Sequence, residues 1–142
     1  MSRVFNTAFE ASLRLVLLLS VIDEPIEFER MVALDTITIY GKSLNLADID
    51  LHNNPERRTE EYSARRYHDK NAINRLVLTS YVKARVYDDS IVFSLTEVGR
   101  EYSDSLSSEY ACDYRKNAMQ VYKSTKEMST DDMISTARDT RR

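Results

Sequence analysis

Glycine and proline are scarce in this chain, and their scarcity restricts the folds that it can adopt. There are two glycines and two prolines among 142 residues, whereas all-β folds need turn residues between many short strands. Hydrophobic residues make up 42% of the chain, which is typical of globular rather than disordered proteins. We therefore expect a mainly helical fold with a substantial buried core.

The most apolar segment is the run Leu15–Ile22, which Arg14 and Asp23 flank. A membrane-spanning helix needs about 20 apolar residues, and the residues after the run do not form a signal-peptide cleavage site. The run therefore predicts a core helix and no membrane association. The pattern Thr7–Glu10 predicts that this helix begins with a capping box. Because the helix is apolar on every side, it should be central to a core or lie between partners.

A second helix is expected shortly afterwards. Asp23 could cap it, Pro25 suits its first turn, and Gly41 is a suitable stop. Its apolar face carries Phe28, Met31, Val32, Asp35 and Ile39. A polar connection over residues 41–55 leads to two further helical stretches, Thr59–Tyr67 and Asp69–Tyr81.

After these helical stretches, the spacing of the hydrophobic residues changes from that of a helix to that of a strand. Val82–Tyr87 alternates apolar and polar residues, Asp88–Ser90 is turn-forming and Ile91–Leu95 is a second strand-like run, which together predict a β-hairpin. Thr96 can cap the next helix. Helix, helix, helix, hairpin, helix is the order of a winged helix-turn-helix domain. We therefore predict a winged-helix-like domain over residues 1–106 and a C-terminal helical extension over residues 107–142, frayed from Thr136.

A basic cluster is the main candidate for a binding surface. Its six cations lie within nineteen positions, and four acids in or directly before this stretch, Glu56, Glu60, Glu61 and Asp69, reduce the local charge to +2, while the whole chain carries −3. The cations are Arg57, Arg58, Arg65, Arg66, Lys70 and Arg75. They could belong to a solvated helix with ion pairs one turn apart. Alternatively, they could bind DNA phosphates or an acidic protein.

Two features bear on DNA binding. Asn71, Asn74 and Arg75 are of the types that read bases, but the predicted wing tip, Asp88–Asp89, would repel phosphates.

Tyrosine is abundant, at nine residues, and is enriched at protein interfaces. We therefore expect Tyr110 and Tyr114 to contribute to partner binding.

The chain has no residue pattern typical of a catalytic or metal site. Neither His52 nor His68 has another histidine or cysteine three or four residues away. Gly41 and Gly99 are the only glycines, so a glycine-rich phosphate loop is excluded. We expect no enzymatic activity, cofactor or metal. The single cysteine, Cys112, cannot form an internal disulfide, which favours a reducing, cytoplasmic location.

Asp35 stands on an apolar helix face, where Arg65 or Arg66 could meet it. Such a buried ion pair would hold two helices in register, although buried pairs are weak evidence of stability. We predict that Asp35→Ala destabilises the fold or a complex. Unchanged melting together with normal complex recovery would contradict this.

The chain resembles the small middle component of ABC-three-component systems, the class that includes the small C subunit of Lamassu anti-phage defence. The order and spacing of several short segments carry the resemblance, over most of residues 5–125. These segments are Asn6–Glu10, Leu13–Leu19, Val32–Asp35, Ile39–Gly41, Leu51–His52, Pro55, Arg65–Arg66, Leu76–Leu78, Val82, Thr96–Gly99 and Ser105–Ala111.

The resemblance implies partners and a process. The partners would be an SMC/Rad50-like ATPase with long coiled coils and an effector, often a nuclease. The small subunit would be a non-catalytic scaffold between them, in defence against phage or plasmid DNA. The alternative from the residues is a DNA-binding winged-helix transcription regulator. A weak direct contact with DNA is compatible with either hypothesis.

Overall fold

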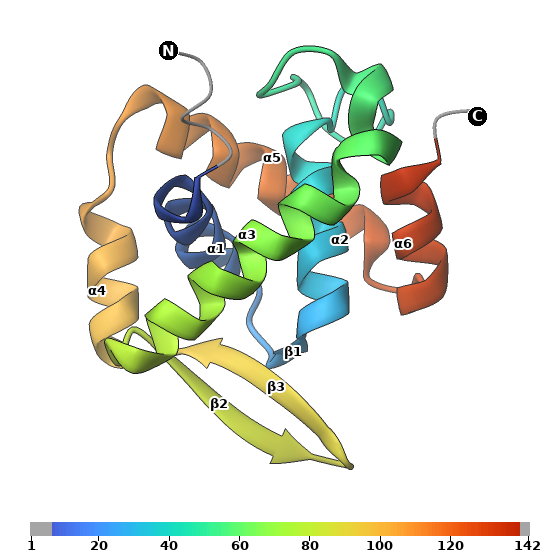
Figure 1. Cartoon of the computed structure of the whole chain (residues 1–142). Coiled ribbons are helices and arrows are strands. Elements are labelled where there is room, and N and C mark those ends of the chain that lie inside the picture. The colour runs from blue at the N-terminus through green and yellow to red at the C-terminus, as the bar shows by residue number, and fades with distance from the viewer. Residues whose placement is uncertain (1–6, 140–142) are drawn as a thin grey trace.

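The computed structural model describes residues 7–139 and is mainly helical, with one small antiparallel sheet (Figure 1). The elements are α1 (Ala8–Val21), β1 (Ile26–Glu27), α2 (Phe28–Ile39), a short 3-10 helix η2 (Pro55–Arg57), α3 (Arg58–Leu78), β2 (Val82–Tyr87), β3 (Ser90–Leu95), α4 (Glu97–Ser105), α5 (Glu109–Thr125) and α6 (Thr130–Arg138). The sheet order is β1-β3-β2. The predicted fold class, a mainly helical winged-helix-like fold with a β-hairpin, is confirmed.

α1 lies at the centre of the core. Thr7 caps it by accepting a hydrogen bond from the backbone N–H of Glu10 at 3.1 Å, as the capping pattern predicts. Leu15–Leu19 are all buried, because α3, α4 and α5 pack around this helix. The apolar run is therefore a core helix. Within the part of the chain that the structure describes, no helix is long and apolar enough to cross a bilayer.

The start of α2 differs from the prediction. Asp23 and Pro25 precede the helix without opening it, because Ile26–Glu27 pairs with β3 as a short strand and α2 begins only at Phe28. The backbone groups of this segment bond to a strand some 65 residues further along the chain, so the local sequence pattern does not reveal the pairing. The predicted end of the helix is confirmed, since it stops two residues before Gly41.

The connection after α2 folds back on the helix end. A Cβ on Gly41 would lie 2.4 Å from the Cβ of Ala47, so only glycine allows this close approach. Asn117 of α5 donates from Nδ2 to the carbonyl oxygens of Thr38 at 2.9 Å and Ile49 at 2.7 Å. This side chain ties the connection to both helices.

α3 is one helix of 21 residues and not the two stretches that the sequence suggested. No proline or glycine interrupts residues 58–78, so the backbone hydrogen bonds continue through His68. The helix crosses α1 and α2 and leads directly to the hairpin (Figure 1). Its C-terminus is closed by two backbone hydrogen bonds, from Tyr81 to Leu76 at 3.0 Å and from Ser80 to Val77 at 3.1 Å.

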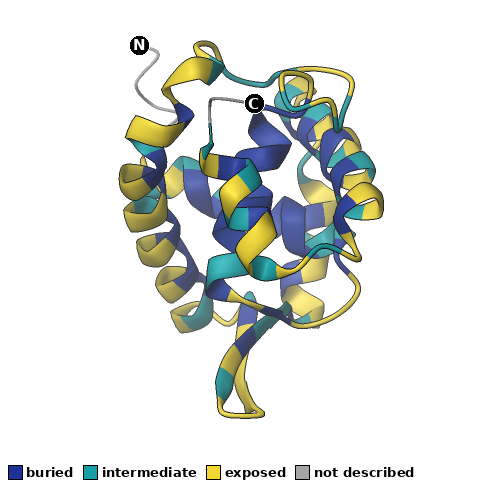
Figure 2. Ribbon diagram, turned by 90° about the vertical axis from the view of Figure 1, so that its right-hand side faces the viewer, coloured by how far each residue is buried: buried dark blue, intermediate teal, exposed yellow. Residues whose placement is uncertain are grey.

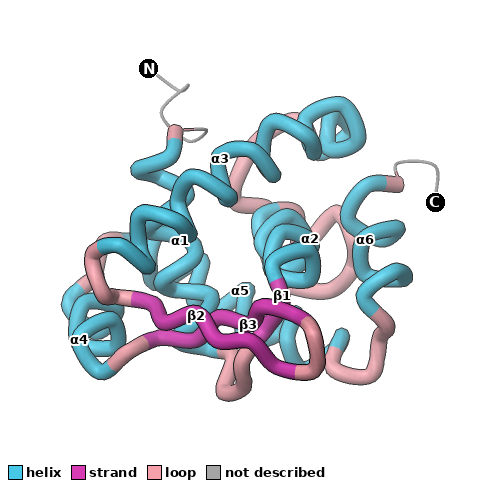
Figure 3. Tube along the Cα trace, turned by 60° about the horizontal axis from the view of Figure 1, so that its bottom comes forward, coloured by secondary structure: helices cyan, strands magenta, loops and turns pink. Residues whose placement is uncertain are grey.

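β2 and β3 form the predicted hairpin. Their register runs from Val82 opposite Leu95 to Tyr87 opposite Ser90. Between them, Asp88 and Asp89 have φ values of 54° and 66°, as a two-residue type I′ turn requires. The hairpin extends beyond the helices (Figure 2), and α4 lies beside its base (Figure 3).

α4 starts as predicted. Thr96 accepts a hydrogen bond from the backbone N–H of Gly99 at 3.0 Å, which satisfies one of the free donors of the first turn. Gly99 itself has no room for a side chain, because a Cβ there would lie 2.0 Å from the carbonyl oxygen of Tyr81. The glycine therefore allows the first turn of α4 to approach the backbone of Tyr81, directly before β2.

α5 and α6 belong to the same hydrophobic core as α1 and α2. Ser108 and Ser129 cap these two helices. The predicted fraying from Thr136 is wrong for residues 136–138, because α6 continues to Arg138 and Ala137 is fully buried. Residues 140–142 lie outside the described part of the chain, as do residues 1–6, which include Asn6. The predicted domain boundary at 106/107 falls between α4 and α5.

Candidate functional site

The predicted basic cluster divides into exposed and buried side chains. Arg57, Arg66, Lys70 and Arg75 are exposed. Arg66 binds Glu29 of α2, with its Nη2 2.5 Å from a carboxylate oxygen. The Nζ of Lys70 lies 4.8 Å from the centroid of the Phe28 ring, a cation–π distance.

Arg57 is partly neutralised as well. Its Nε lies 3.4 Å from a carboxylate oxygen of Glu60 and 3.3 Å from one of Glu61. Exposed pairs of this kind contribute about 0–1 kcal/mol to stability, but they lower the positive charge that a phosphate backbone would meet.

Arg58 and Arg65 are buried, so they present little surface to a partner. Arg58 donates from Nε to the carbonyl oxygen of Ala137 at 2.9 Å and from Nη2 to that of Asp139. It therefore closes the C-terminus of α6, where a cation is favourable. Arg65 is 3% exposed and donates to the hydroxyl of Tyr40 at 3.5 Å.

The two tyrosines that the sequence assigned to a partner also face inward. Tyr114 is fully buried and donates its hydroxyl to Asp35 Oδ1 at 2.7 Å. Tyr110 is half-buried, with its hydroxyl 3.0 Å from Nε2 of His52. Burial, followed by the charges of Arg14 and Arg65, lowers the pKa of His52 to about 3. His52 is therefore neutral at physiological pH.

Asp35 is the centre of a buried polar cluster. It is 0% exposed, as the sequence led us to expect of a buried charge. The expected partner is wrong, however: Arg14 of α1 and not Arg65 or Arg66 forms the ion pair. Arg14 donates from Nε to Asp35 Oδ1 at 3.0 Å and from Nη2 to Oδ2 at 3.2 Å. Arg14 also reaches Asp69 of α3, with 3.5 Å between Nη2 and Oδ1, so the cluster joins α1, α2, α3 and α5.

The two buried carboxyl groups of the cluster differ in their pKa values. Burial and the neighbouring Asp35 raise the pKa of Asp69 well above its ordinary value. Burial also acts to raise the pKa of Asp35, but the charge of Arg14 together with hydrogen bonds from Asp69 and Arg14 lowers that pKa below its ordinary value. Asp35 is therefore the stronger acid of the two and carries negative charge opposite Arg14, whereas Asp69 holds its proton more tightly than an ordinary carboxyl group.

One sequence signal could have identified the true partner of Asp35. Arg14 is the only charged residue between Ala11 and Ile22, and a lone cation inside an apolar helix needs a buried counter-charge. The length of the Arg14 side chain and the packing of α1 against α2 then decide which acid it reaches.

The outward face of α3 and the hairpin form a second, exposed region. Side chains at helical spacing along α3 are exposed, and two of them are large and apolar: Tyr67 is 64% exposed and Leu78 is 84% exposed. Asn71, Asn74 and Arg75 lie between them and are exposed as well. We call this set of five residues the α3 stripe. The hairpin adds Val86, which is 77% exposed, and Figure 2 shows the hairpin projecting from the helical body.

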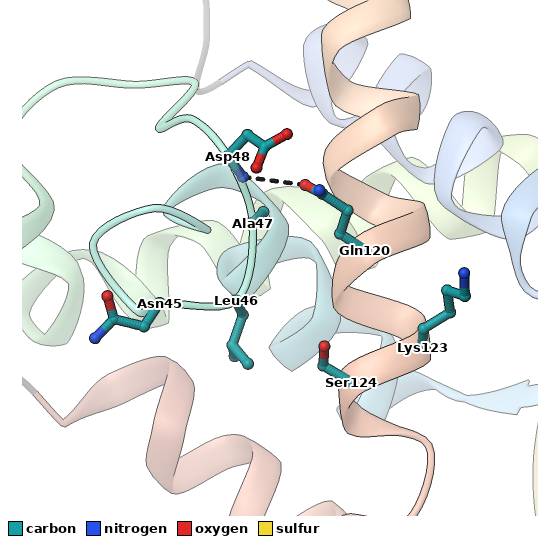
Figure 4. A pocket seen from close by; sticks show the side chains of 7 residues that line it. All are labelled: Asn45, Leu46, Ala47, Asp48, Gln120, Lys123 and Ser124. Atoms are coloured by element: carbon teal, nitrogen blue, oxygen red, sulfur yellow. Dashed lines mark hydrogen bonds between the residues drawn. The ribbon is translucent and has the colours of Figure 1, made fainter.

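Two observations concern the binding of a small molecule or of a metal ion. A shallow pocket of about 400 Å³ lies where the connection after α2 meets α5, and the backbone N–H of Asp48 donates across it to Gln120 at 3.0 Å (Figure 4). Among residues 7–139, no three His, Cys, Asp or Glu side chains gather in a way that could hold a metal ion.

Comparison with known protein families identifies the family to which the chain belongs. Residues 4–141 match the family described as ABC-three component (ABC-3C) system Middle Component 2. The chain belongs to this family. The match extends over nearly the whole sequence, from before α1 to beyond α6. No curated protein matches the chain, and no solved structure does.

Membership of Middle Component 2 makes this protein one component of a multi-component system. The resemblance that the sequence suggested is therefore confirmed at the level of the family. Such a subunit needs surfaces for other components, and the α3 stripe and the hairpin are exposed regions of the chain that contain large apolar side chains.

Proposed function

We propose that this Middle Component 2 is a non-catalytic scaffold subunit of a Lamassu-like anti-phage or anti-plasmid defence complex. In that complex it bridges an SMC/Rad50-like coiled-coil ATPase and an effector nuclease in the cytoplasm. The family assignment carries the proposal, because a middle component acts together with others. The identities of the two partners come from the resemblance to the Lamassu small subunit.

The α3 stripe supports a docking role. Tyr67 and Leu78 lie on a helix whose exposed residues are otherwise mostly polar, and large apolar side chains on a polar surface are typical of the centre of an interface. Arg75 and the two asparagines between them can form hydrogen bonds at its rim. We assign this stripe to the contact with the ATPase. Of the predicted basic surface, the exposed Arg57, Arg66, Lys70 and Arg75 remain candidates for partner contacts.

Reconstitution of the complex tests this function. The tagged protein is co-expressed with the ATPase and the effector encoded beside it, and the products are separated by size-exclusion chromatography. We expect a ternary complex, and no ATPase–effector complex when the middle component is omitted. If the ATPase and effector assemble equally well without it, the scaffold proposal is wrong.

A paired substitution locates the contact. Burial of a large apolar side chain contributes about 1.5–3 kcal/mol, so Tyr67→Ser with Leu78→Ser should weaken ATPase capture at least about tenfold. Met119→Ser on α5 is the matched control, because Met119 is 52% exposed and lies outside the stripe. Equal effects of the two variants would contradict the assignment of the α3 stripe.

The exposed Asn71, Asn74 and Arg75 favour DNA binding as the second candidate function. In that case the isolated protein would bind a short duplex with sequence preference at physiological salt. We expect instead weak binding with a shallow dependence on salt, which indicates few phosphate contacts. Sequence-specific binding without any recruitment of the ATPase would identify a winged-helix regulator.

A further inference from the structure

The outer edge of β2 carries backbone groups that lack a neighbouring strand among the described residues. In the sheet order β1-β3-β2, β2 is an edge strand. Tyr87 pairs with Ser90 across the two-residue turn, so the hydrogen bonds to β3 come from every second residue of β2 back from the turn. The N–H and C=O groups of Ala84 and Val86 therefore point away from β3, towards solvent.

One face of the hairpin carries apolar side chains that are exposed to water, which is unusual for a solvated hairpin. On one face, Val86 lies opposite Ile91 and Ala84 lies opposite Phe93. Val86 and Ile91 are 77% and 56% exposed, so apolar side chains at the outer end of this face are in contact with water. Exposed strand edges next to apolar side chains are sites where another chain adds a strand.

The other face of β2 carries positive charge. Lys83 and Arg85 alternate with the apolar residues and are both exposed. A strand added beside β2 would place its own side chains alternately next to the apolar and the basic face. The chemistry of the edge therefore specifies a segment in which apolar residues alternate with Asp or Glu.

We propose that β2 accepts an extended, alternately apolar and acidic segment of a partner component by β-strand addition. This inference rests on the proposed function, since it supposes that the chain assembles with other components. Main-chain hydrogen bonds from Ala84 and Val86 hold the segment, and its side chains provide the specificity.

Neither a second copy of the chain nor DNA fits this edge as well. Two β2 strands paired with each other would bring Lys83 and Arg85 of one copy beside the same cations of the other, which is unfavourable. The turn residues Asp88 and Asp89 lie at the end of the same edge and repel phosphates. An acidic peptide segment is attracted by the two cations and can end before the turn.

Hydrogen exchange of single backbone amides tests the proposal in the assembled complex. The amides of Ala84 and Val86 should exchange rapidly in the free protein and at least about tenfold more slowly in the complex. The amide of Arg85 already faces β3 and serves as the internal control, protected in both states. Unchanged exchange at Ala84 and Val86 in a complex that does assemble overturns strand addition and leaves the scaffold proposal intact.

Substitutions provide an independent measurement. Ala84→Pro removes an outward N–H without removing a hydrogen bond to β3, a position where edge strands tolerate proline. It should weaken complex formation at least tenfold, whereas Ala84→Thr, which keeps the N–H, should not. If Ala84→Pro melts earlier than the parent protein, the charge reversals Lys83→Glu and Arg85→Glu replace it and should weaken capture similarly.

The outcomes separate the two proposals. Normal capture by Ala84→Pro and by the charge-reversed protein contradicts strand addition alone. Failure of the unmodified protein to bind any component contradicts both strand addition and the scaffold function. Dimerisation of the isolated protein that Ala84→Pro abolishes would show that a second copy is the occupant instead.

Discussion

At the scale of single residues, the buried cluster around Asp35 shows how tertiary packing assigns charge. Asp35 and Asp69 both contact the guanidinium of Arg14 in the core, and the charge of the buried Arg65 also acts on both carboxyl groups. Asp35 has the shorter contacts, at 3.0 Å and 3.2 Å, and it also accepts the hydroxyl of Tyr114. Asp69 lies 3.5 Å from Arg14, and its raised pKa means that it holds its proton more tightly.

This assignment predicts different effects for two similar substitutions. Asp35→Asn leaves Arg14 without its closest counter-charge and should lower the free energy of unfolding at pH 7 by about 3–5 kcal/mol. Asp69→Asn resembles the protonated form, which the raised pKa of Asp69 favours, so it should cost less than about 1 kcal/mol. Urea unfolding of both proteins measures the difference. An Asp69→Asn protein as unstable as Asp35→Asn would contradict the assignment.

The same pair predicts a pH dependence. The folded-state pKa of Asp69 is raised above its ordinary value, so the folded protein holds a proton that the unfolded chain releases. The resulting stabilisation is present below the ordinary carboxyl pKa of about 3.9 and is lost as pH rises through the raised pKa. Asp69→Asn should remove this decline, which unfolding measurements between pH 4 and pH 9 would detect.

At the scale of elements, local rules located most helix starts correctly. The predicted caps Thr7 and Thr96 each accept a hydrogen bond from the first turn of the following helix, because an N-cap depends on residues only three positions apart. The hairpin was equally predictable from its alternation and its turn. The start of α2 was not, since a strand pairing distant in sequence replaced the expected first turn.

The end of α3 offers a prediction at this scale. Ser80 has a φ of 69° at the position after a helix where glycine is preferred. Ser80→Gly should therefore raise the free energy of unfolding by about 0.5–1 kcal/mol, because glycine adopts this conformation without steric cost. Thr79→Gly is the matched control: Thr79 has a φ of −92°, which needs no glycine, so that substitution should destabilise. Thermal and urea unfolding measure both.

At the scale of the whole molecule, the helices after the hairpin complete the core of those before it. Tyr114, Ala118 and Val121 of α5 are at most 1% exposed and join the cluster that contains α1 and α2. Met133 and Ala137 of α6 are fully buried in the same cluster. The predicted extension over residues 107–142 therefore contributes directly to the stability of the winged-helix-like part.

Truncation after residue 106 tests this dependence. Each large apolar side chain that loses its burial costs about 1.5–3 kcal/mol, and a whole domain has only about 5–15 kcal/mol of stability. The shortened protein should lose cooperative unfolding and near-ultraviolet circular dichroism. A cooperative transition with retained helicity would instead establish residues 1–106 as an independent domain.

What the sequence alone determined is what depends on near neighbours: the helical class, the N-caps Thr7 and Thr96, the hairpin with its acidic turn, and the burial of Asp35. The family resemblance also came from short segments in a defined order. Tertiary structure alone decided the partner of Asp35, the strand before α2, the burial of Arg58 and Arg65, and the open edge of β2. These features join residues far apart in the chain, and their energies depend on which surfaces the packed core leaves in contact with water.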